Sequence, residues 1–578
     1  MNIKTPKFNE TLKKIFDDLV PHSRACKQCG KDFDVVAEDI EFYHKLQVPP
    51  PTLCPACRLQ RRLGYRISFF PIFYKKSCSA PDHDEKVVTY YSEKNPVKVY
   101  DDKYYLSDAW DGLEFGMDVE ADESFFQKFH NLAIAAPRQT LSKDPKSVDC
   151  EYVVSGVSSK DCYFVAIPYS SERVYYAYLP SFTKDCIDVS GTINCEQSYE
   201  CIDAENCYNC KFVYESSDCM DSAFLYDCRN CSNCFGCTNL RNKKYCFFNE
   251  QLTREQYEEK MKEINLGSRS TLSKYKGKFQ ELLQNAIRKH VSNVQTENCV
   301  GDNIHKSKNC YSVFLVVEEA ENLRYVSSVG NMTETMDVFG GTNASLGYEC
   351  SGIVGTNDVR FSTMLRTALD IEYSAECTNC EHCFGCFGLK DKKFCIFNKQ
   401  YTEEEYWEKI DELKTAMLER GEYGEFFPLK DSWYPYKDSN AQVEFPLTKE
   451  EIVANRWHWE DEQDSDLDLS KISVLQASEV PDDIADVSDD ILKTPIVCER
   501  TGKPFKIMPF ELDFYRKSNI PIPTVHPLQR IKDRFEYRKP FRLWKDNCRK
   551  CGVGVDTVFD PAKKLRIYCE ACYNAELH

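Results

Sequence analysis

Four cysteines near the start of the chain have the types and the spacing of a metal site. They form two C-x2-C pairs separated by a spacer of hairpin length, and they are Cys26, Cys29, Cys54 and Cys57. Two such knuckles supply the four thiolates that tetrahedral Zn2+ prefers. Because four protein ligands leave no open position for water or substrate, we expect a structural zinc ion here, without a catalytic role.

The other end of the chain carries a second set of the same kind. Its two C-x2-C pairs consist of Cys548, Cys551, Cys569 and Cys572. The residues between the pairs, VGVDTVFDPAKKLRIY, predict a β-hairpin with a turn in the middle. The expected cofactor is therefore Zn2+ in two structural sites, and the sequence contains no nucleotide-binding motif that would indicate an organic cofactor.

The residues around the first site are duplicated. Residues 26–66, the N-terminal module, recur without a gap as residues 498–538, the C-terminal module, at an offset of 472. Glycine, aromatic, proline and arginine positions coincide, but of the four cysteines only Cys498 remains. The other ligand positions hold Thr501, His526 and Gln529. The C-terminal module is expected to lack a metal, which indicates that zinc supports the module and is not its chemistry.

A basic segment follows the last cysteine of the N-terminal module and predicts a short helix that could lie on a phosphate backbone. Its candidate nucleic-acid contacts, with their duplicated counterparts, are Arg58, Arg61, Arg62, Tyr65, Arg66, Arg530, Arg534 and Arg538. Guanidinium groups would supply charge and the tyrosine a stacking ring. The alternative is that these arginines pair with carboxylates of the same chain, such as Glu38 or Glu41.

The interior of the chain contains a second duplication, at an offset of 148–149. SKDCYF at 159–164 recurs as SKNCYS at 307–312, and CRNCSNCFGCTNLRNKKYCFFN at 228–249 recurs as CTNCEHCFGCFGLKDKKFCIFN at 377–398. Cysteines at spacings of 21 to 24, with short strands such as CYFVAI, VYYAYL, CKFVYE and SAFLYD, predict coils of a right-handed parallel β-solenoid. A plain multi-stranded sheet is the alternative.

Each interior copy contains a run of cysteines spaced three residues apart. The eight cysteines are Cys228, Cys231, Cys234, Cys237, Cys377, Cys380, Cys383 and Cys386. Thiols stacked in the core are the favoured interpretation, and a zinc site is the second. An iron–sulfur cluster is the least favoured, because the x3-C-P ending of ferredoxin runs is missing.

Helical patterns separate the repeats. Thr253 with Gln256 and Thr402 with Glu405 form capping boxes, and LSKYKGKFQELLQNAIRKHV predicts a further helix between the copies. The predicted fold is multi-domain and mainly β, with helical additions. The predicted order is an N-terminal zinc ribbon (1–75), a metal-less ribbon-like hairpin and connector from Cys78 (76–147), solenoid copy 1 (148–249), a helical bridge (250–296), solenoid copy 2 (297–399), a capping helix and loop (400–442), an acidic linker (443–495), a degenerate ribbon (496–545) and a C-terminal zinc ribbon (546–578).

Composition limits the remaining choices. The 578 residues carry a net charge of −18, which argues against a general nucleic-acid binder, although residues 499–578 hold 17 basic against 10 acidic side chains. No apolar run reaches membrane-spanning length and no secretory leader is recognisable, so we expect no membrane association and a cytoplasmic location. The 31 cysteines are accordingly expected to be reduced or metal-bound.

The chain resembles an uncharacterised family of large zinc-ribbon and cysteine-repeat proteins, found mainly in candidate-phyla (Patescibacteria-type) bacteria. The resemblance covers nearly the whole chain and lies in CKQCGKDF, FYHKLQVPPPTLCPACRLQRR, NCFGCTNLRNKKYCFFNEQLTREQYEEK and CERTGKPF. The first motif also resembles a family of probable zinc-binding ribbons with a CxxCGKxF…CxxCR signature. These resemblances imply zinc binding, and no established activity accompanies them. The chain departs from the pattern in the hairpin after Cys78 and in several positions of the second copy.

The sequence favours a zinc-binding, non-enzymatic scaffold whose basic modules engage RNA, DNA or a ribonucleoprotein. A purely structural or protein-interaction solenoid with structural zinc is the first alternative. An enzyme of β-helix type that acts on polysaccharide is less favoured, because the repeats show no regular cluster of carboxylates. No HExxH, Walker or Rossmann pattern is present.

Overall fold

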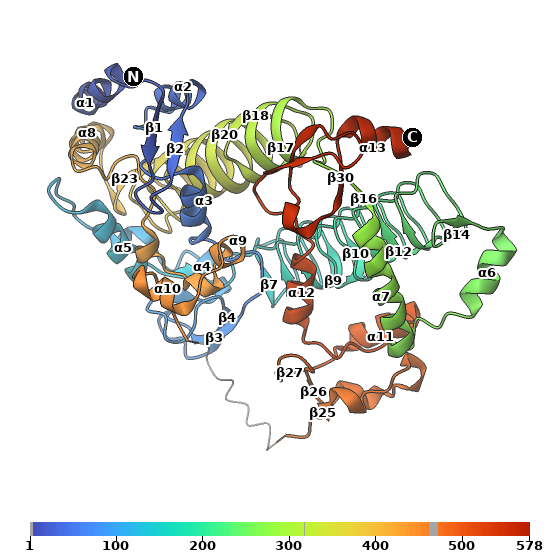
Figure 1. Ribbon diagram of the computed structural model, residues 1–578. Helices are drawn as coiled ribbons and strands as arrows, with labels where there is room; N and C mark the ends of the chain where they lie inside the picture. The colour runs from blue at the N-terminus through green and yellow to red at the C-terminus, as the bar shows by residue number, and fades with distance from the viewer. Residues whose placement is uncertain (1–3, 317, 462–471, 578) are drawn as a thin grey trace.

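The computed structural model describes residues 4–316, 318–461 and 472–577 (Figure 1). It is a mixed α/β architecture of several sheets, most of them parallel, with a cysteine cluster near each end. Two long blocks of parallel strands dominate the molecule, and Figure 1 shows each block as a stack of successive chain turns. Helices and small antiparallel hairpins surround the two stacks.

The first parallel block begins near residue 148. Its strands are β7 (Val153–Val154), β8 (Tyr163–Ala166), β9 (Glu172–Tyr178), β10 (Lys184–Ile187), β11 (Lys211–Tyr214), β12 (Ala223–Tyr226), β13 (Phe235–Thr238) and β14 (Cys246–Phe247). Tyr163 pairs with Tyr175, and Ala223 pairs with Phe235, so that each residue meets its counterpart in the next turn of the chain. Isolated bridges between β10 and β11, such as Ser190 with Ile202, continue this register. An antiparallel strand, β15 (Glu250–Gln251), ends the block.

The second parallel block repeats this arrangement. It comprises β17 (Glu297–Ile304), β18 (Ser307–Val316), β19 (Ala320–Arg324), β20 (Ser327–Arg360), β21 (Thr363–Glu372), β22 (Thr378–Phe384), β23 (Lys393–Ile396) and the antiparallel β24 (Lys399–Gln400). Ser351 pairs with Thr363 and Arg366 with Thr378, in the same register as in the first block.

The length of one chain turn differs from the expected repeat unit. Hydrogen bonds between successive turns join side chain and backbone at a sequence separation of 12, as the Ser171 amide does with Ser159 and the Ser374 amide with Ser362. The longer unit predicted from the cysteine spacing is therefore wrong, because that spacing marks about every second turn.

Left-handed backbone conformations explain the short turn. From Asn206 to Asn233 a residue with positive φ recurs at every third position, and most of these residues are Asn, Asp or Glu. Asn and Asp tolerate this conformation better than other non-glycine residues, since their side chains form local hydrogen bonds. Each such residue turns the chain, and the abundance of Asn and Asp in the repeats suits this backbone, although Phe212 and Phe224 adopt the same conformation.

The helices occupy the expected places with small differences. Thr253 caps α6 (Arg254–Lys262) and Thr402 caps α8 (Glu403–Glu419), and both capping boxes are confirmed. α8 packs against α1 (Pro6–Asp17), whose first amides donate to Asp411. The bridging helix α7 (Arg269–Asn285) ends earlier than predicted, and the chain then forms β16 (Ile287–Lys289).

Four small modules each begin with an antiparallel hairpin and end with a helix. The N-terminal module contains β1 (His22–Ala25), β2 (Asp32–Val35), α2 (Ala37–Leu46) and α3 (Pro55–Leu63); its duplicate contains β26 (Ile496–Val497), β27 (Pro504–Phe505), α11 (Pro509–Ser518) and α12 (Pro527–Phe535). The module after residue 73 contains the hairpin of β3 (Tyr74–Ser77) and β4 (Lys86–Thr89), followed by α4 (Asp102–Leu106). The last module contains β28 (Trp544–Asn547), β29 (Gly554–Thr557), β30 (Arg566–Tyr568) and α13 (Glu570–Leu577).

The hairpin predicted between the last two cysteine pairs is wrong. β29 pairs with β28, which precedes the first cysteine, whereas β30 pairs in parallel with the distant β16. Tertiary pairing thus overrode the local turn signal of Asp560 and Pro561, which instead begin a short 3-10 turn. A second distant pairing of this kind joins β5 (Val99–Tyr100) to β6 (Arg138–Gln139), which follows α5 (Phe125–Ala135).

The predicted acidic linker differs from a solvated chain where the structure describes it. Residues 440–444 and 449–454 form α9 (Asn440–Glu444) and α10 (Lys449–Ala454), and β25 (Leu475–Gln476) pairs with β26. Val480, Ile484 and Ile491 are buried. Residues 462–471 lie outside the described residues. Apolar side chains lie between the carboxylates and anchor this segment in the core. The net charge of the segment, on which the linker prediction is based, gives no sign of them.

Candidate metal centres

The four N-terminal cysteines come together as predicted. Cys26 directly follows β1, Cys54 is the N-cap of α3, and Cys57 lies in the first turn of that helix. The four Sγ atoms all lie within 4.8 Å of one another, and Cys29 Sγ is 3.8 Å from Cys54 Sγ. Cys26, Cys54 and Cys57 are buried, whereas Cys29 is exposed. This geometry fits one tetrahedral ion with four protein ligands.

The local electrostatics favour the thiolate form of Cys26 and Cys54, whereas the pKa of Cys57 is raised, chiefly by its hydrogen bond with Cys54, and the pKa of Cys29 is also raised. The Cys54 amide donates to Cys26 Sγ at 3.3 Å. A hydrogen bond from Cys57 is the main cause that lowers the pKa of Cys54 to about 5. Burial raises the pKa of Cys26, but backbone hydrogen bonds from Cys29 and Cys54 outweigh it and the net shift is downward. A deprotonated thiol is the form that binds a metal.

The C-terminal cysteines form a second cluster of the same shape. The Sγ atoms of Cys548, Cys551, Cys569 and Cys572 lie within 4.8 Å of one another. Cys551 Sγ is 3.8 Å from Cys569 Sγ. Burial opposes ionisation of Cys548, yet backbone hydrogen bonds from Cys551 and Cys569 lower its pKa to about 6. Both predicted four-cysteine groups can therefore hold a metal ion.

A shared backbone turn positions the first cysteine of each cluster. The Cys26 amide donates to the Lys31 carbonyl at 2.9 Å, and the Gly30 amide donates to the Cys26 carbonyl at 2.9 Å. The equivalent bonds at Cys548 go to Val553 and from Gly552. Gly30 and Gly552 have φ of 73° and 78°, a conformation that glycine adopts without strain.

The C-terminal module keeps this turn but uses its ligand positions differently. Cys498 makes the same backbone bonds, to Lys503 and from Gly502. His526 takes the position of Cys54, and its Nδ1 accepts a hydrogen bond from the Leu528 amide at 3.1 Å. The imidazole therefore caps α12 with the nitrogen that faces the helix.

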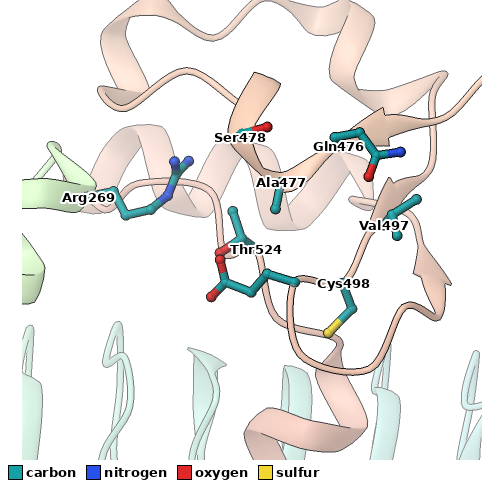
Figure 2. Close-up of a pocket in the computed structure, with 8 residues that line it drawn as sticks. Arg269, Gln476, Ala477, Ser478, Val497, Cys498 and Thr524 are labelled. Carbon is teal, nitrogen blue, oxygen red and sulfur yellow. The ribbon is translucent and has the colours of Figure 1, made fainter.

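Figure 2 shows a shallow depression beside this module, with a volume of about 500 Å3. Its lining consists of Arg269, Gln476, Ala477, Ser478, Val497, Cys498, Glu499 and Thr524. Arg269 is fixed to the backbone carbonyls of Val480 and Pro481. The lining groups come from four separate stretches of the chain and belong to the seam where the acidic segment docks, so we assign no chemistry to this depression.

The eight cysteines of the repeat runs lie inside the parallel blocks and are buried. Their thiols contact backbone carbonyls of their own turn and of the neighbouring turn, as Cys228 does with Tyr226 at 3.6 Å and Cys237 at 3.7 Å. Among the residues that the structure describes, none of the eight belongs to a group of three or more ligand atoms close enough to share an ion. Their placement matches core thiols stacked in successive turns of the chain.

The arginines of α3 are not where the nucleic-acid hypothesis needs them. Arg58, Arg61 and Arg62 are buried. Arg58 Nε lies 2.8 Å from Asp337 Oδ2, and Arg62 bridges Asp337 at 3.1 Å and Glu349 at 3.2 Å. Arg61 bridges Glu349 at 3.1 Å and Glu425 at 2.7 Å. Ion pairing within the chain, the alternative interpretation, is what the structure shows, although the partners are distant carboxylates and not Glu38 or Glu41.

The duplicated helix α12 repeats this arrangement on the other parallel block. Arg534 Nη1 lies 2.7 Å from Asp188 Oδ1, and Arg530 lies 3.2 Å from Asp188 Oδ2. Both arginines are buried. The remaining candidates are also engaged: Tyr65 donates to the Pro428 carbonyl, Arg66 is half-buried against Met364, and Arg538 pairs with Glu444. None of the eight predicted contact residues, all of which the structure describes, presents a free side chain to a polyanion.

Sequence reasoning missed the carboxylates, although a signal for them exists. Asp188 and Asp337 occupy equivalent positions of the two repeats, at an offset of 149. Glu511 and Asp39 occupy equivalent positions of the two modules, at an offset of 472. The two duplications mark these acids as recurring positions, but their burial and their contact with the arginines appear only in the structure.

A third group of potential ligands was also missed. Cys78, His83, Glu85 and Asp101 bring a thiol, an imidazole and two carboxylates within 4.8 Å of one another, in the hairpin that the sequence predicted to be metal-less.

Comparison of the chain with protein-family models, with curated proteins and with solved structures found no match. The family resemblance thus rests on its motifs, and the two four-cysteine groups are the part that the structure supports. Within the described residues no helix has the length and apolar character needed to span a bilayer.

Proposed function

We propose that the protein is a non-catalytic scaffold in which two β-solenoids are held together by zinc-stabilised modules. The constant parallel register supports the solenoid assignment, because each turn then buries its inner side chains only against its neighbours. Inward Cys, Val and Leu side chains form a separate core in each block. A right-handed β-helix remains the proposed winding, by the rule for parallel crossovers.

Zinc is the proposed metal at both four-cysteine groups. Four thiolates in tetrahedral reach select soft or borderline ions, and a closed site suits an ion without redox chemistry. Cys54 begins α3 and Cys57 lies in its first turn, so an ion here would fix the helix that carries Arg58 and Arg62. The zinc would stabilise the docking helix and take no part in a reaction.

The observation that carries the scaffold proposal is the burial of module arginines against repeat carboxylates. Arg58 and Arg62 reach Asp337, whereas Arg530 and Arg534 reach Asp188. A module that displays its cations to RNA would leave them exposed. Here the cations bind the chain's own repeats, so the modules act as clamps. A cytoplasmic location accompanies the proposal, because reduced thiols are needed at every site.

The test uses the full chain purified with zinc in the medium. Elemental analysis should find one zinc fewer in Cys29→Ser and in Cys551→Ser, while Cys498→Ser should keep the wild-type content. Hydrogen exchange of Cys29→Ser should show lost protection in α3 and in the part of β20 that it contacts. Unchanged zinc in both ligand variants would refute the metal assignment, and unchanged exchange would refute the clamp.

The polyanion alternative is tested in the same preparation. Labelled single-stranded RNA and duplex DNA should not bind even at about 50 mM salt, where electrostatic binding is strong, because the predicted contact arginines are buried. Binding that weakens steeply with salt would contradict the scaffold proposal and would require a different cationic surface.

A further inference from the structure

We propose that Cys78, His83, Glu85 and Asp101 form a third metal site, suited to a single zinc ion bound by one thiolate, one imidazole and two carboxylates. The site lies in the β3–β4 hairpin and the loop before α4. Zinc accepts this mixture of sulfur, nitrogen and oxygen ligands. The inference is independent of the scaffold proposal, since it concerns a different module.

The distances between the ligand atoms are close to those around a tetrahedral ion, but two of them are slightly shorter and one is slightly longer. His83 Nδ1 lies 2.9 Å from Glu85 Oε1 and 3.1 Å from Asp101 Oδ2. Cys78 Sγ lies 3.9 Å from Asp101 Oδ2. Zinc bonds of about 2.0–2.3 Å would place neighbouring ligand atoms about 3.3–3.8 Å apart. Small side-chain movements would therefore suffice to bind the ion.

The backbone of this hairpin repeats the frame of the N-terminal cysteine cluster. Cys78 directly follows β3 as Cys26 follows β1. The Ser79 amide donates to the Val99 carbonyl at 2.7 Å, as the Lys27 amide does to Thr52 at 3.1 Å. These bonds tie the knuckle to the segment that leads into the following helix in both modules.

The second ligand position is matched as well. The Asp101 amide donates to Cys78 Sγ at 3.3 Å, and the Cys54 amide donates to Cys26 Sγ at the same distance. Asp101 is the N-cap of α4 and Cys54 is the N-cap of α3. Asp101 Oδ1 accepts the amides of Lys103 and Tyr104, which leaves Oδ2 directed at Cys78 and His83.

The turn between the strands supplies the remaining ligands. The Cys78 amide bonds to the carbonyl seven residues later, at Glu85, whereas the Cys26 amide bonds five residues later, at Lys31. The two additional residues accommodate His83 and Glu85 in the turn where the N-terminal module has Cys29. Cys78 is more than nine-tenths buried beneath them, and the Tyr104 ring packs edge-on against the imidazole at 5.3 Å.

Elemental analysis of the full chain tests this site. Wild type should contain three zinc ions per chain, and His83→Ala and Cys78→Ser should each contain two. Glu93→Gln is the matched control, because Glu93 binds Ser77 of the same hairpin but lies outside the ligand group. It should retain three ions.

Cobalt substitution provides a second readout that requires no substitution of the buried Cys78. The difference between the cobalt spectra of wild type and His83→Ala should show d–d bands with weak sulfur charge transfer, as one thiolate would give. Two zinc ions in wild type, unchanged in His83→Ala, would overturn the third site and leave the scaffold proposal intact. A chain without any bound metal would overturn both.

Discussion

Arg58 and Arg62 place two guanidinium groups almost wholly out of water, where an unpaired charge would cost several kcal/mol. Asp337 and Glu349 supply two carboxylates directly against them. Burial is the largest single influence and lowers the pKa of Arg58, but nearby negative charges, Asp337 first among them, together outweigh it and raise the pKa well above its usual value. The group is therefore charged at any working pH, and the pair favours one docking geometry more than it adds net stability.

His526 gives the clearest pH dependence at the residue scale. Burial, with nearby Arg530, Lys503 and Lys532, lowers its pKa to about 4, whereas an unfolded histidine titrates near 6.5. Between pH 6.5 and 4 the unfolded state binds a proton that the folded state rejects. We expect the contribution of His526 to the free energy of unfolding to be complete above pH 6.5 and to fall by on the order of 2 kcal/mol as the pH drops to 4.

His526→Asn isolates this contribution, because Asn also caps helices but does not titrate. Urea unfolding of the C-terminal module, followed at pH 7 and pH 5, should show a smaller loss at pH 5 in the variant than in wild type. The comparison of the two proteins cancels metal loss common to both. An equal loss in both proteins would contradict the assignment.

At the scale of the element, residues with positive φ determine how the chain turns in the repeats. Asn209 has φ of 49°, and its side chain donates to Asp221 of the next turn at 2.7 Å. A β-branched residue is strained in this conformation. We expect Asn209→Val to lower the opening free energy of β11 and β12 by about 1–2 kcal/mol more than Asn209→Gly does.

Native-state hydrogen exchange at the amides of β11 and β12 measures this effect. Tyr208→Val is the matched control, since Tyr208 is exposed and next to Asn209 but does not have positive φ. It should change protection little. Equal effects of Val at both positions would show that the turn does not depend on the conformation of Asn209.

Sequence reasoning succeeded where the signal is local. Thr402 with Glu405 identifies a helix start because both hydrogen bonds lie within one turn. Paired C-x2-C knuckles likewise identify their own cluster. The predicted repeat length was wrong because the inward cysteines belong to more than one set of equivalent positions in successive turns. Cys195, Cys207 and Cys219 form one such set, while Cys186 and Cys210 belong to another.

Long-range contacts could not be predicted in this way. Asp337 is 279 residues from Arg58, and only the docking of a helix on a strand brings them together. The third ligand group was missed because its four residue types differ and their spacing is irregular. Both failures concern sites whose members share no periodicity in the chain.

At the scale of the whole molecule the modules cross over. The N-terminal module docks on the second parallel block through Asp337, and the C-terminal module docks on the first block through Asp188. Phe69, just after the N-terminal module, also contacts Phe339 of the second block and Phe535 of α12. Each half of the chain thus contributes the clamp for the other half.

This crossover predicts that the two halves stay together after the chain is cut between the blocks. A protease site inserted after Lys262, at the exposed end of α6, divides the chain into residues 1–262 and 263–578. After cleavage the fragments should co-migrate in gel filtration at physiological salt. The reason is that α3 of the first fragment docks on the parallel block of the second, and α12 of the second fragment docks on the parallel block of the first. Adding Arg58→Leu with Arg62→Leu, and Arg530→Leu with Arg534→Leu, leaves the buried Asp337 and Asp188 unpaired, which costs about 3–5 kcal/mol at each site, and should separate the fragments. Arg549→Leu, which removes an exposed pair with Asp546, is the control and should leave them associated. Separation of the unmodified fragments without denaturant would show that the peptide connection, and not the crossed clamps, holds the blocks together.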